Sequence, residues 1–475
     1  MITPDTPDRV YSTRLRTALV LTGSGTAGAY HAGVLRAFQE AGVKIDLVAG
    51  RGIGVVAALF AAIDGGARLW EPNGVWKGTA ASAFYAWRKP LRAAVWVMAA
   101  AAIVLATPLV LLVFAVVMAI IGMLLTLVGL TTAASSTTTA YTQWIEALFA
   151  PTFLPTIIPR LVLLAVLVAA VPLVATAVRG RFGPGARRRS RQGLIGRALG
   201  GPLSTLALEQ RCAGELWHLI RGAAPLAAPP FPELGQRYLE LLAENLGQPG
   251  FRELLLTVHD MDVRRDLVFA LLGAPQRQRF FTRATGDGRN RQVEAFDLAG
   301  IGRDYLLDVL SAALALPVAA EPHLITFAPE DPWRGETHRT CDRPGSLTRL
   351  VEEIAAAGAE QVILVSGSPA AALPHELSAG RADIRGRAGE HLAAFETANV
   401  RDVIEHFTGR FAGLFVLRPT HNPLGPLDFH GAYDERSDRP HSLGELVDRG
   451  YEDAYRQFIE PVVGASGERI ATVQR

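Results

Sequence analysis

The pattern of apolar and polar positions near the start of the chain predicts a strand, a glycine-rich loop, a helix and a second strand. Residues 16–22 form an apolar run of the length of a buried strand, and residues 23–28 follow it with three glycines. Residues 29–42 carry apolar positions at helical spacing, and a second apolar run at residues 45–49 leads into a glycine turn at residues 50–54. This order is typical of an α/β fold.

The same alternation returns in the second half of the chain. The pattern there predicts a strand at residues 254–258, a second apolar segment at 267–272 and a helix at 304–316. It then predicts a helix at residues 347–357, a strand at 361–365 and a final helix at 443–459. Before them, residues 203–247 predict two amphipathic helices separated by an Ala- and Pro-rich stretch at residues 223–232. We therefore expect a mostly parallel sheet covered by helices, with the two amphipathic helices as a cap.

An uncharged block separates the two halves. Residues 93–145 contain no Asp, Glu, Lys or Arg, and residues 161–178 form a second apolar run. As one helix, residues 93–130 would be roughly twice as long as the ~30 Å hydrocarbon layer of a membrane. Residues 131–159 are rich in Thr, Ser and Pro, which is typical of an interfacial connection. We expect a transmembrane helical hairpin over residues 91–180.

Basic residues flank this block on both sides. Three precede it and a dense cluster follows it: Arg88, Lys89 and Arg92, then Arg179, Arg181, Arg187, Arg188, Arg189 and Arg191. Because basic flanks stay on the cytoplasmic side, we expect an integral membrane protein with its soluble domain on that side. A buried helical hairpin of a soluble protein stays open as the alternative. The polar residues 1–14 do not have the pattern of a signal peptide.

These patterns divide the chain into four parts. Residues 1–90 and 251–475 are expected to form one α/β domain, because strands from both must join one sheet. Residues 91–180 are the expected hairpin, and residues 181–250 are expected to form a basic linker and the helical cap.

Composition narrows the range of functions. The chain has 47 Lys and Arg against 45 Asp and Glu, a net charge of +2, so we expect no nucleic acid as partner. Its two cysteines, Cys212 and Cys341, are too few for a disulfide framework and fit a reducing compartment. The histidines lack the spacing of a metal site, and we expect no metal and no cofactor. Membrane lipids are the expected partners, and the sequence indicates no particular protein partner.

The glycine turn carries the candidate chemistry. It reads Gly50-Arg51-Gly52-Ile53-Gly54. In a nucleophile elbow, glycines flank a serine that is held in a strained strand-to-helix turn. Here the central position is a glycine as well, so the position of the nucleophile carries no hydroxyl.

The order of these features resembles the patatin-like phospholipase family, in which a glycine-rich oxyanion loop opens the first helix and a Gly-x-Ser-x-Gly elbow follows the second strand. The resemblance implies a patatin-like three-layer α/β/α domain, here interrupted by the hairpin, and hydrolysis of lipid acyl esters through an acyl-serine. Ala27 departs from it, because the family usually has Arg or Lys there. The resemblance assigns the oxyanion loop to Gly23, Gly25 and Gly28, and the elbow to Gly50 and Gly54. It places the missing nucleophile at Gly52.

The family pairs its serine with an aspartate in an Asp-Gly-Gly or Asp-Gly-Ala motif. Asp342 is the best positional match before the predicted strand at residues 361–365, and Asp331 is the second choice. Neither is followed by glycine. By this resemblance Asp342 is the candidate dyad aspartate.

Four hypotheses about function follow. The first is a membrane-anchored family member in lipid metabolism that binds lipid and is impaired in hydrolysis. The second is an active lipid acyl hydrolase with another nucleophile, for which Ser24, Ser366 and Ser368 are candidates. The third is a nucleotide-binding membrane protein, because residues 23–28 match a dinucleotide fingerprint and Asp46 could hold a ribose. The fourth is a membrane scaffold, in which the glycines only permit tight turns.

Overall fold

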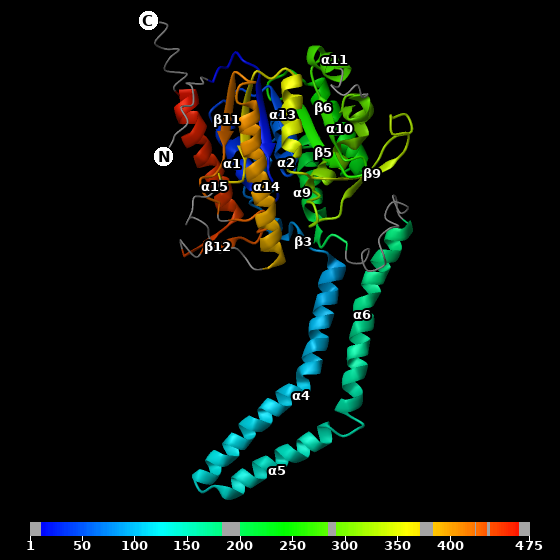
Figure 1. Ribbon diagram of the computed structural model, residues 1–475, viewed down its shortest axis with the longest axis vertical. Helices are drawn as coiled ribbons and strands as arrows, with labels where there is room; N and C mark the ends of the chain where they lie inside the picture. The colour runs from blue at the N-terminus through cyan, green and yellow to red at the C-terminus, as the bar shows by residue number, and fades with distance from the viewer. Residues whose placement is uncertain are drawn as a thin grey trace. The chain divides into compact units, whose positions relative to one another are not determined.

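The computed structural model describes residues 11–182, 200–283, 291–370, 383–422, 424–434 and 438–464. The chain forms two compact units, one of which is built from two separate stretches. Unit 1 comprises Met1–Ala86 and Leu203–Arg475, and unit 2 comprises Trp87–Pro202. Figure 1 shows the helices and strands of both.

Unit 1 is built around a mostly parallel sheet (Figure 1). Its main path runs, in spatial order, through β11 (Gly413–Leu417), β10 (Gln361–Ser366), β1 (Thr17–Thr22), β2 (Leu47–Arg51), β5 (Glu253–Asp260), β6 (Arg265–Leu271) and β7 (Ala295–Asp297). The strands from β11 to β5 are parallel, and β6 runs antiparallel to β5. The short strands β8 (His323–Thr326) and β9 (Thr337–Cys341) pair with each other, and β9 also pairs with β5. This confirms the predicted α/β class with a mostly parallel sheet.

The strands at the centre of the sheet are buried on both faces. Every residue of β1 is buried. Leu19 and Leu21 belong to one core cluster, whereas Ala18 and Val20 belong to the other, because successive side chains of a strand point to opposite faces. A strand that is enclosed on both sides needs apolar residues at every position, and the continuous apolar run therefore predicts it correctly.

Helices cover both faces of the sheet. The larger core cluster contains residues of α1 (Ala27–Glu40), α2 (Gly54–Ala62), α9 (Leu206–Arg221), α10 (Phe231–Glu244), α12 (Leu306–Leu314) and α15 (Leu443–Ala454). The smaller cluster contains residues of α11 (Ala274–Thr282), α13 (Ser346–Ala356) and α14 (Ile384–Phe407). The two predicted amphipathic helices are α9 and α10, and the hydroxyl of Tyr238 in α10 donates to the carbonyl of Leu59 in α2 at 2.6 Å.

Short elements join the longer ones. They are the helical turns α3 (Ala67–Trp70), η1 (Thr79–Ala83), η2 (Arg291–Val293), η3 (Ile301–Tyr305) and η4 (Tyr455–Gly464), and two small sheets that pair β3 (Ala86–Trp87) with β4 (Leu203–Ser204) and β12 (Ala432–Asp434) with β13 (Arg439–His441).

Some boundaries differ from the predicted ones. The second strand is Leu47–Arg51 rather than residues 45–49, because Arg51 still pairs with Thr257 of β5. A buried strand can end with an arginine here because carboxylates from other elements pair with its charge. The helix predicted at residues 304–316 begins as the turn η3 and continues as α12, and the last helix continues beyond α15 as the π-helical η4.

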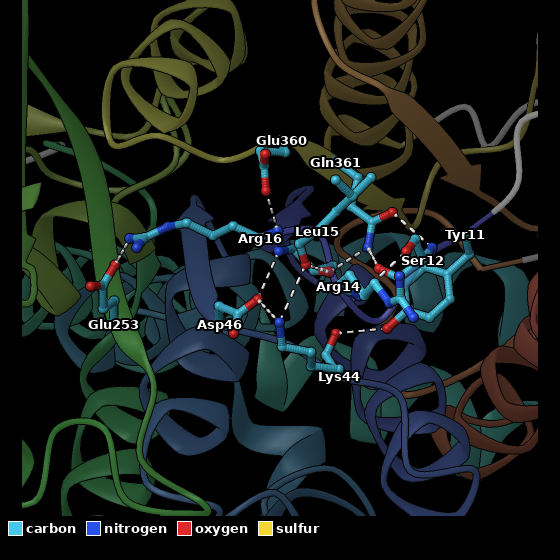
Figure 2. A network of polar contacts seen from close by, with 11 residues as sticks. Tyr11, Ser12, Arg14, Leu15, Arg16, Lys44, Asp46, Glu253, Glu360 and Gln361 are labelled. Carbon is cyan, nitrogen blue, oxygen red and sulfur yellow. Dashed lines mark hydrogen bonds and ion pairs between the residues drawn. The ribbon is translucent and has the colours of Figure 1, made fainter.

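Polar side chains gather at the amino ends of β1, β2, β5 and β10 (Figure 2). The Asp46 carboxylate accepts from the first N–H of β1 at 2.8 Å and pairs with Lys44 at 3.2 Å. The Arg16 N–H donates to Glu360 at 2.8 Å, and the Arg16 guanidinium pairs with Glu253. These side chains satisfy backbone groups at the ends of the strands. We call Arg16, Lys44, Asp46, Glu253 and Glu360 the amino-end network.

The described residues of unit 2 form the helices α4 (Lys89–Leu127), α5 (Thr131–Leu148) and α6 (Leu154–Phe182). Two stretches are long and apolar enough to cross a membrane, Lys89–Leu127 with 39 residues and Leu154–Ala175 with 22. Their side chains are largely exposed, whereas a core helix of a soluble protein would be mostly buried. By length and composition alone, these helices support membrane association.

Within unit 2, α4 packs against both α5 and α6. The Tyr141 hydroxyl of α5 donates to the Leu111 carbonyl of α4 at 2.6 Å. Pro108 lies inside α4, where its missing N–H weakens the helix, and α4 is bent in Figure 1. The basic cluster at residues 187–191 lies outside the described residues, and the cytoplasmic orientation stays a prediction.

Candidate functional site

The glycine-rich loop and the glycine turn meet at the carboxyl edge of the sheet. The loop follows β1 and the turn follows β2, and these two parallel strands are neighbours. The Ile53 N–H donates to the Gly23 carbonyl at 3.0 Å, so that the turn and the loop are in direct contact. Each then opens a helix, α1 at Ala27 and α2 at Gly54. This edge is where ligands bind in open α/β sheets.

The residue at the centre of the glycine turn has a left-handed backbone conformation. Gly52 has a φ of +54°, the left-handed region that is strained for residues with a Cβ. A Cβ at Gly52 would lie 2.8 Å from Asp342 Oδ2 and would overlap the Gly23 carbonyl oxygen. A side chain at position 52 would therefore point at Asp342, but the surrounding atoms leave no room for it.

The flanking glycines are required by close packing. A Cβ at Gly50 would lie 2.8 Å from the Gly54 carbonyl oxygen, and one at Gly54 would overlap the Leu21 carbonyl oxygen. In the loop, a Cβ at Gly28 would overlap the Trp76 ring. These glycines permit a tight strand-to-helix turn whether or not the site has any chemistry.

Asp342 reaches the turn from the end of β9. It is 1% exposed, and its N–H donates to the Ala315 carbonyl at 3.0 Å. The second candidate, Asp331, is also buried, but its carboxylate accepts from the Tyr305 hydroxyl and from the Ala328 N–H. The structure thus places Asp342 at the turn, whereas the Asp331 carboxylate is engaged within its own loop and by Tyr305.

Arg51 ties Asp342 to a second carboxylate. Its guanidinium is fully buried and donates to Asp342 Oδ1 from Nη1 at 3.1 Å, to Glu396 Oε1 from Nη2 and to Thr22 Oγ1 from Nε at 2.9 Å. Ser24 completes the group, because its hydroxyl lies 3.0 Å from Glu396 Oε1 and 3.5 Å from Asp342 Oδ2. We call Ser24, Arg51, Asp342 and Glu396 the carboxyl-end cluster.

Sequence reasoning missed Glu396, and the chain contains a signal that could have found it. Glu396 lies in the middle of α14, on the face whose other members are Leu392, Val400, Val403 and Phe407. An acidic residue in an apolar stripe at helical spacing must be neutralised by a partner or by protonation. The pattern indicates a buried carboxylate, but only the fold identifies Arg51 as its partner.

The carboxyl-end cluster holds two carboxylates for one arginine. Burial raises the pKa of Asp342 to about 7, the Arg51 charge opposes that rise, and the nearby Glu396 adds to it. Glu396 Oε2 is buried and has no hydrogen-bond partner among the described residues. Burial of Asp342 beside a second carboxylate thus favours the protonated form of its carboxyl group.

The donors of the glycine-rich loop bind carbonyls of the protein itself. The Thr26 N–H donates to the Pro426 carbonyl at 3.0 Å, and the Thr26 hydroxyl donates to the Gly425 carbonyl at 3.0 Å. A Cβ at Gly25, whose φ is +58°, would overlap the Pro426 carbonyl oxygen. The segment around Pro426 thus lies directly on the loop.

Ser366 lies at the same edge of the sheet as the glycine-rich loop, because it pairs with Thr22 at the end of β1, whereas Asp46 lies at the other end of the strands. The Ser366 hydroxyl, at the end of β10, accepts from the Ser368 N–H at 3.2 Å. Asp46 lies before β2 and belongs to the amino-end network, at the opposite end of the sheet from the loop. The nucleotide hypothesis requires an acid at the carboxyl end of the second strand, and Asp46 does not satisfy it.

Within the described ranges, no group of three His, Cys, Asp or Glu side chains could hold a metal ion. His338 is fully buried and pairs with Asp260 at 2.5 Å. Cys212 and Cys341 are both free and buried, and burial raises the pKa of the Cys341 thiol to about 12. Neither cysteine is in the thiolate form that acts as a nucleophile at neutral pH.

Comparison with known proteins gives a short stretch of similarity. No protein-family model matches the chain. Over 45 residues, 9% of the chain, it is 56% identical to patatin-like phospholipase domain-containing protein 6 of Mus musculus and of Homo sapiens. The chain spans only 3% of the length of these curated relatives. Among solved structures, VipD from Legionella pneumophila aligns with 94% of this chain and 67% of its own, with 10% identity and a TM-score of 0.29.

Proposed function

We propose that the protein is a membrane-anchored relative of the patatin-like phospholipases that binds lipid at its glycine-rich loop and does not hydrolyse it through the elbow. The observation that carries this proposal is the Asp342 carboxylate 2.8 Å from the position that a Cβ of residue 52 would take. A relationship to these phospholipases is supported by the 45-residue similarity. Membrane anchoring is supported by the two apolar helices.

The argument against hydrolysis concerns the nucleophile and its base. A serine hydrolase needs a hydroxyl that its base can deprotonate and donors that stabilise the oxyanion. Gly52 supplies no hydroxyl, and Asp342 is engaged by Arg51. Restoring the serine alone does not repair the site, because its Cβ would overlap the Gly23 carbonyl oxygen. We therefore expect Gly52→Ser to be inactive as well.

The argument for lipid binding concerns Thr26. Its N–H and its hydroxyl are two donors at the start of α1, and both donate to carbonyl oxygens. The ester group of an acyl lipid also offers a carbonyl oxygen as a hydrogen-bond acceptor. The donors that would stabilise an oxyanion in an enzyme can hold a neutral ester carbonyl without any reaction.

The test compares ester-linked with ether-linked lipids. The full chain is reconstituted in nanodiscs that contain both diacyl and dialkyl phosphatidylcholine, which differ only in the ester carbonyls, and lipid retention is measured by native mass spectrometry. We expect preferential retention of the ester lipid by the parent and by Thr26→Ser, which keeps both donors. Thr26→Pro removes both donors while the φ of −63° suits proline, and the preference should disappear. Equal retention of both lipids by the parent contradicts the proposal.

The same samples measure hydrolysis. We expect release of fatty acid from the diacyl lipid at the background rate of an empty nanodisc for the parent, for Gly52→Ser and for Ser24→Ala. Turnover by the parent would overturn the first proposal.

A second candidate function rests on Ser24. Its hydroxyl lies within 3.5 Å of both Asp342 and Glu396, and a pKa near 7 lets Asp342 accept a proton. In this scheme Ser24 Oγ attacks the ester carbonyl, its proton passes to Asp342, and the lipid alcohol leaves before water releases the fatty acid. A fluorophosphonate probe would then label Ser24, and Ser24→Ala would abolish both the label and the turnover. Absence of label on the parent excludes this candidate.

A further inference from the structure

Residues 424–431 form a turn with hydrogen bonds of its own, and Gly425 and Pro426 within it contact the glycine-rich loop. The Gly425 N–H donates to Asp428 Oδ2 at 2.9 Å, and the Asp428 N–H donates back to the Gly425 carbonyl at 3.1 Å. The Gly431 N–H donates to the Asp428 carbonyl at 3.0 Å. We call residues 424–431 the plug. Because these bonds are internal, they can persist when the plug moves as one body.

The plug occupies both donors of Thr26 and the space above Gly25. The Pro426 and Gly425 carbonyls accept from the Thr26 N–H and hydroxyl, both at 3.0 Å. A residue with a Cβ at position 25 would collide with Pro426, so the contact requires the glycine. The loop is thus closed by the same kind of acceptor that an ester lipid would offer.

Other contacts also hold the plug, and its Leu424 and Leu427 side chains are buried in the larger core cluster. The Phe429 ring is buried and stacks on Tyr85 with ring centroids 5.2 Å apart, and it meets Phe84 edge-on at 6.0 Å. On the other side, a Cβ at Gly389 of α14 would lie 3.3 Å from Pro426 Cδ. Gly389 lies two helical turns before Glu396 on α14, so one helix contacts both the plug and the carboxyl-end cluster.

The two aromatic residues that pack on Phe429, Phe84 and Tyr85, lie where the chain leaves unit 1. Phe84 and Tyr85 are the two residues before Ala86, at which the first stretch of unit 1 ends. The Tyr85 hydroxyl donates to the Leu314 carbonyl at 2.7 Å, and Arg385 Nη2 donates to the Tyr85 carbonyl at 3.1 Å. The residues that hold the plug are therefore joined by a short piece of chain to the start of α4 at Lys89.

We propose that the plug is an autoinhibitory contact, which an acyl-lipid carbonyl must displace to reach Thr26. This inference rests on the proposed lipid-binding function. The plug keeps the two donors satisfied when no lipid is present, which avoids the free-energy cost of unpaired buried donors. Release of the stacked Phe429 ring from Tyr85 is the step that opens the loop.

Hydrogen exchange measures the opening directly. The full chain is placed in nanodiscs of diacyl phosphatidylcholine or in nanodiscs of dialkyl phosphatidylcholine, and exchange of peptides that cover residues 424–431 is followed by mass spectrometry. We expect faster exchange of the plug in the diacyl discs. In Phe429→Ala the plug should exchange about tenfold faster than in the parent in both kinds of disc, because the aromatic stack is lost.

Matched variants separate opening from general loss of stability. Phe296 of β7 is equally buried and stacks on Phe269 at 5.0 Å in another part of unit 1, so Phe296→Ala should leave plug exchange unchanged. Asp428→Asn weakens the internal turn with less loss of packing and serves if Phe429→Ala does not fold.

Two outcomes overturn the inference in different ways. If the parent retains ester lipid preferentially but its plug exchanges equally in both kinds of disc, lipid binds without displacing the plug, and the autoinhibitory contact is wrong. If the parent retains both lipids equally, the lipid-binding function itself is wrong, whatever Phe429→Ala does. Preferential retention that increases in Phe429→Ala, together with faster plug exchange in diacyl discs, supports both.

Discussion

The amino-end network and the carboxyl-end cluster lie at opposite ends of the same strands and use the same kinds of side chain, but they are built differently. In the amino-end network, carboxylates accept from backbone N–H groups, and the side chains of Arg16 and Glu253 are 19% and 11% exposed. In the carboxyl-end cluster, the side chains of Arg51 and Glu396 are 0% and 1% exposed and pair with each other. The first arrangement supplies hydrogen-bond partners for backbone groups at the amino ends of the strands. The second concentrates charge in the interior beside a glycine turn with left-handed backbone.

The difference shows where to look for function in an α/β sheet. Side chains that hydrogen-bond to backbone groups at the ends of strands have a structural role, because those backbone groups need partners. Two acids for one buried arginine are costly and have no such structural necessity. Burying two acids beside one arginine costs free energy without serving the sheet. This cost, rather than the number of charged residues, identifies the carboxyl edge as the candidate site.

Removal of the buried arginine should have the largest effect on stability. Arg51→Met leaves the buried acids Asp342 and Glu396 without their positively charged partner and should lower the free energy of unfolding by about 3–5 kcal/mol. Arg16→Met breaks a partly exposed pair and should cost about 1 kcal/mol. Chemical denaturation of the full chain in detergent measures both. Equal losses would mean that the two clusters do not differ in the way their burial suggests.

Substitution of Gly52 in the glycine turn should have the next largest effect on stability. Gly52→Ala introduces a Cβ in left-handed backbone and against the Gly23 carbonyl, and should lower the free energy of unfolding by about 2–4 kcal/mol. Gly42 is the matched control, because its φ is +66° and no described atom lies within 4 Å of its Cβ position. Gly42→Ala should cost about 1 kcal/mol from backbone strain alone. A cost for Gly52→Ala no greater than that of Gly42→Ala would show that the turn has room for a side chain.

Stability should also respond to pH through Asp342. Its pKa is raised to about 7 in the folded chain, above the ordinary value of 3.8, so the folded state binds the proton more tightly. This contribution is fully present below pH 4 and is lost as pH rises towards 7, so stability should fall by on the order of 1–3 kcal/mol between pH 5 and 8. Asp342→Asn should remove that part of the dependence. An identical pH profile for the variant would contradict the raised pKa.

The smallest effect is expected at the exposed edge of the amino-end network. The side chains of Lys44 and Asp46 are 40% and 29% exposed and lie 3.2 Å apart. Lys44→Ala should change the free energy of unfolding by less than about 1 kcal/mol, and added salt should reduce the difference further. A loss comparable to that of Arg51→Met would show that the network contributes far more than its exposure indicates.

Local patterns predicted the buried strands β1, β2, β5 and β10 and the glycine turns, because their causes are local, but β7, β8, β9 and β11 were not predicted. The apolar run at residues 16–22 and the paired glycine turns follow directly from burial and tight backbone geometry. Asp342 was found through its spacing and the family resemblance. Helix α14 and its Glu396 were missed, since the partner of that carboxylate is Arg51, 345 residues earlier in the chain. The contact of Pro426 with Gly25 was equally hidden, because a backbone carbonyl leaves no mark on the sequence.

The insertion of unit 2 into unit 1 has a consequence for biosynthesis. β2 ends at Arg51, but β5, its neighbour in the sheet, begins only at Glu253. At the usual rate of translation this delay of about 200 residues lasts about 10–40 s. During that time the apolar strands β1 and β2 have emerged without their final partners, while α4, α5 and α6 are being synthesised. Nascent chains stalled within this window should therefore depend on chaperones, and completion of β5 and β10 should end that dependence.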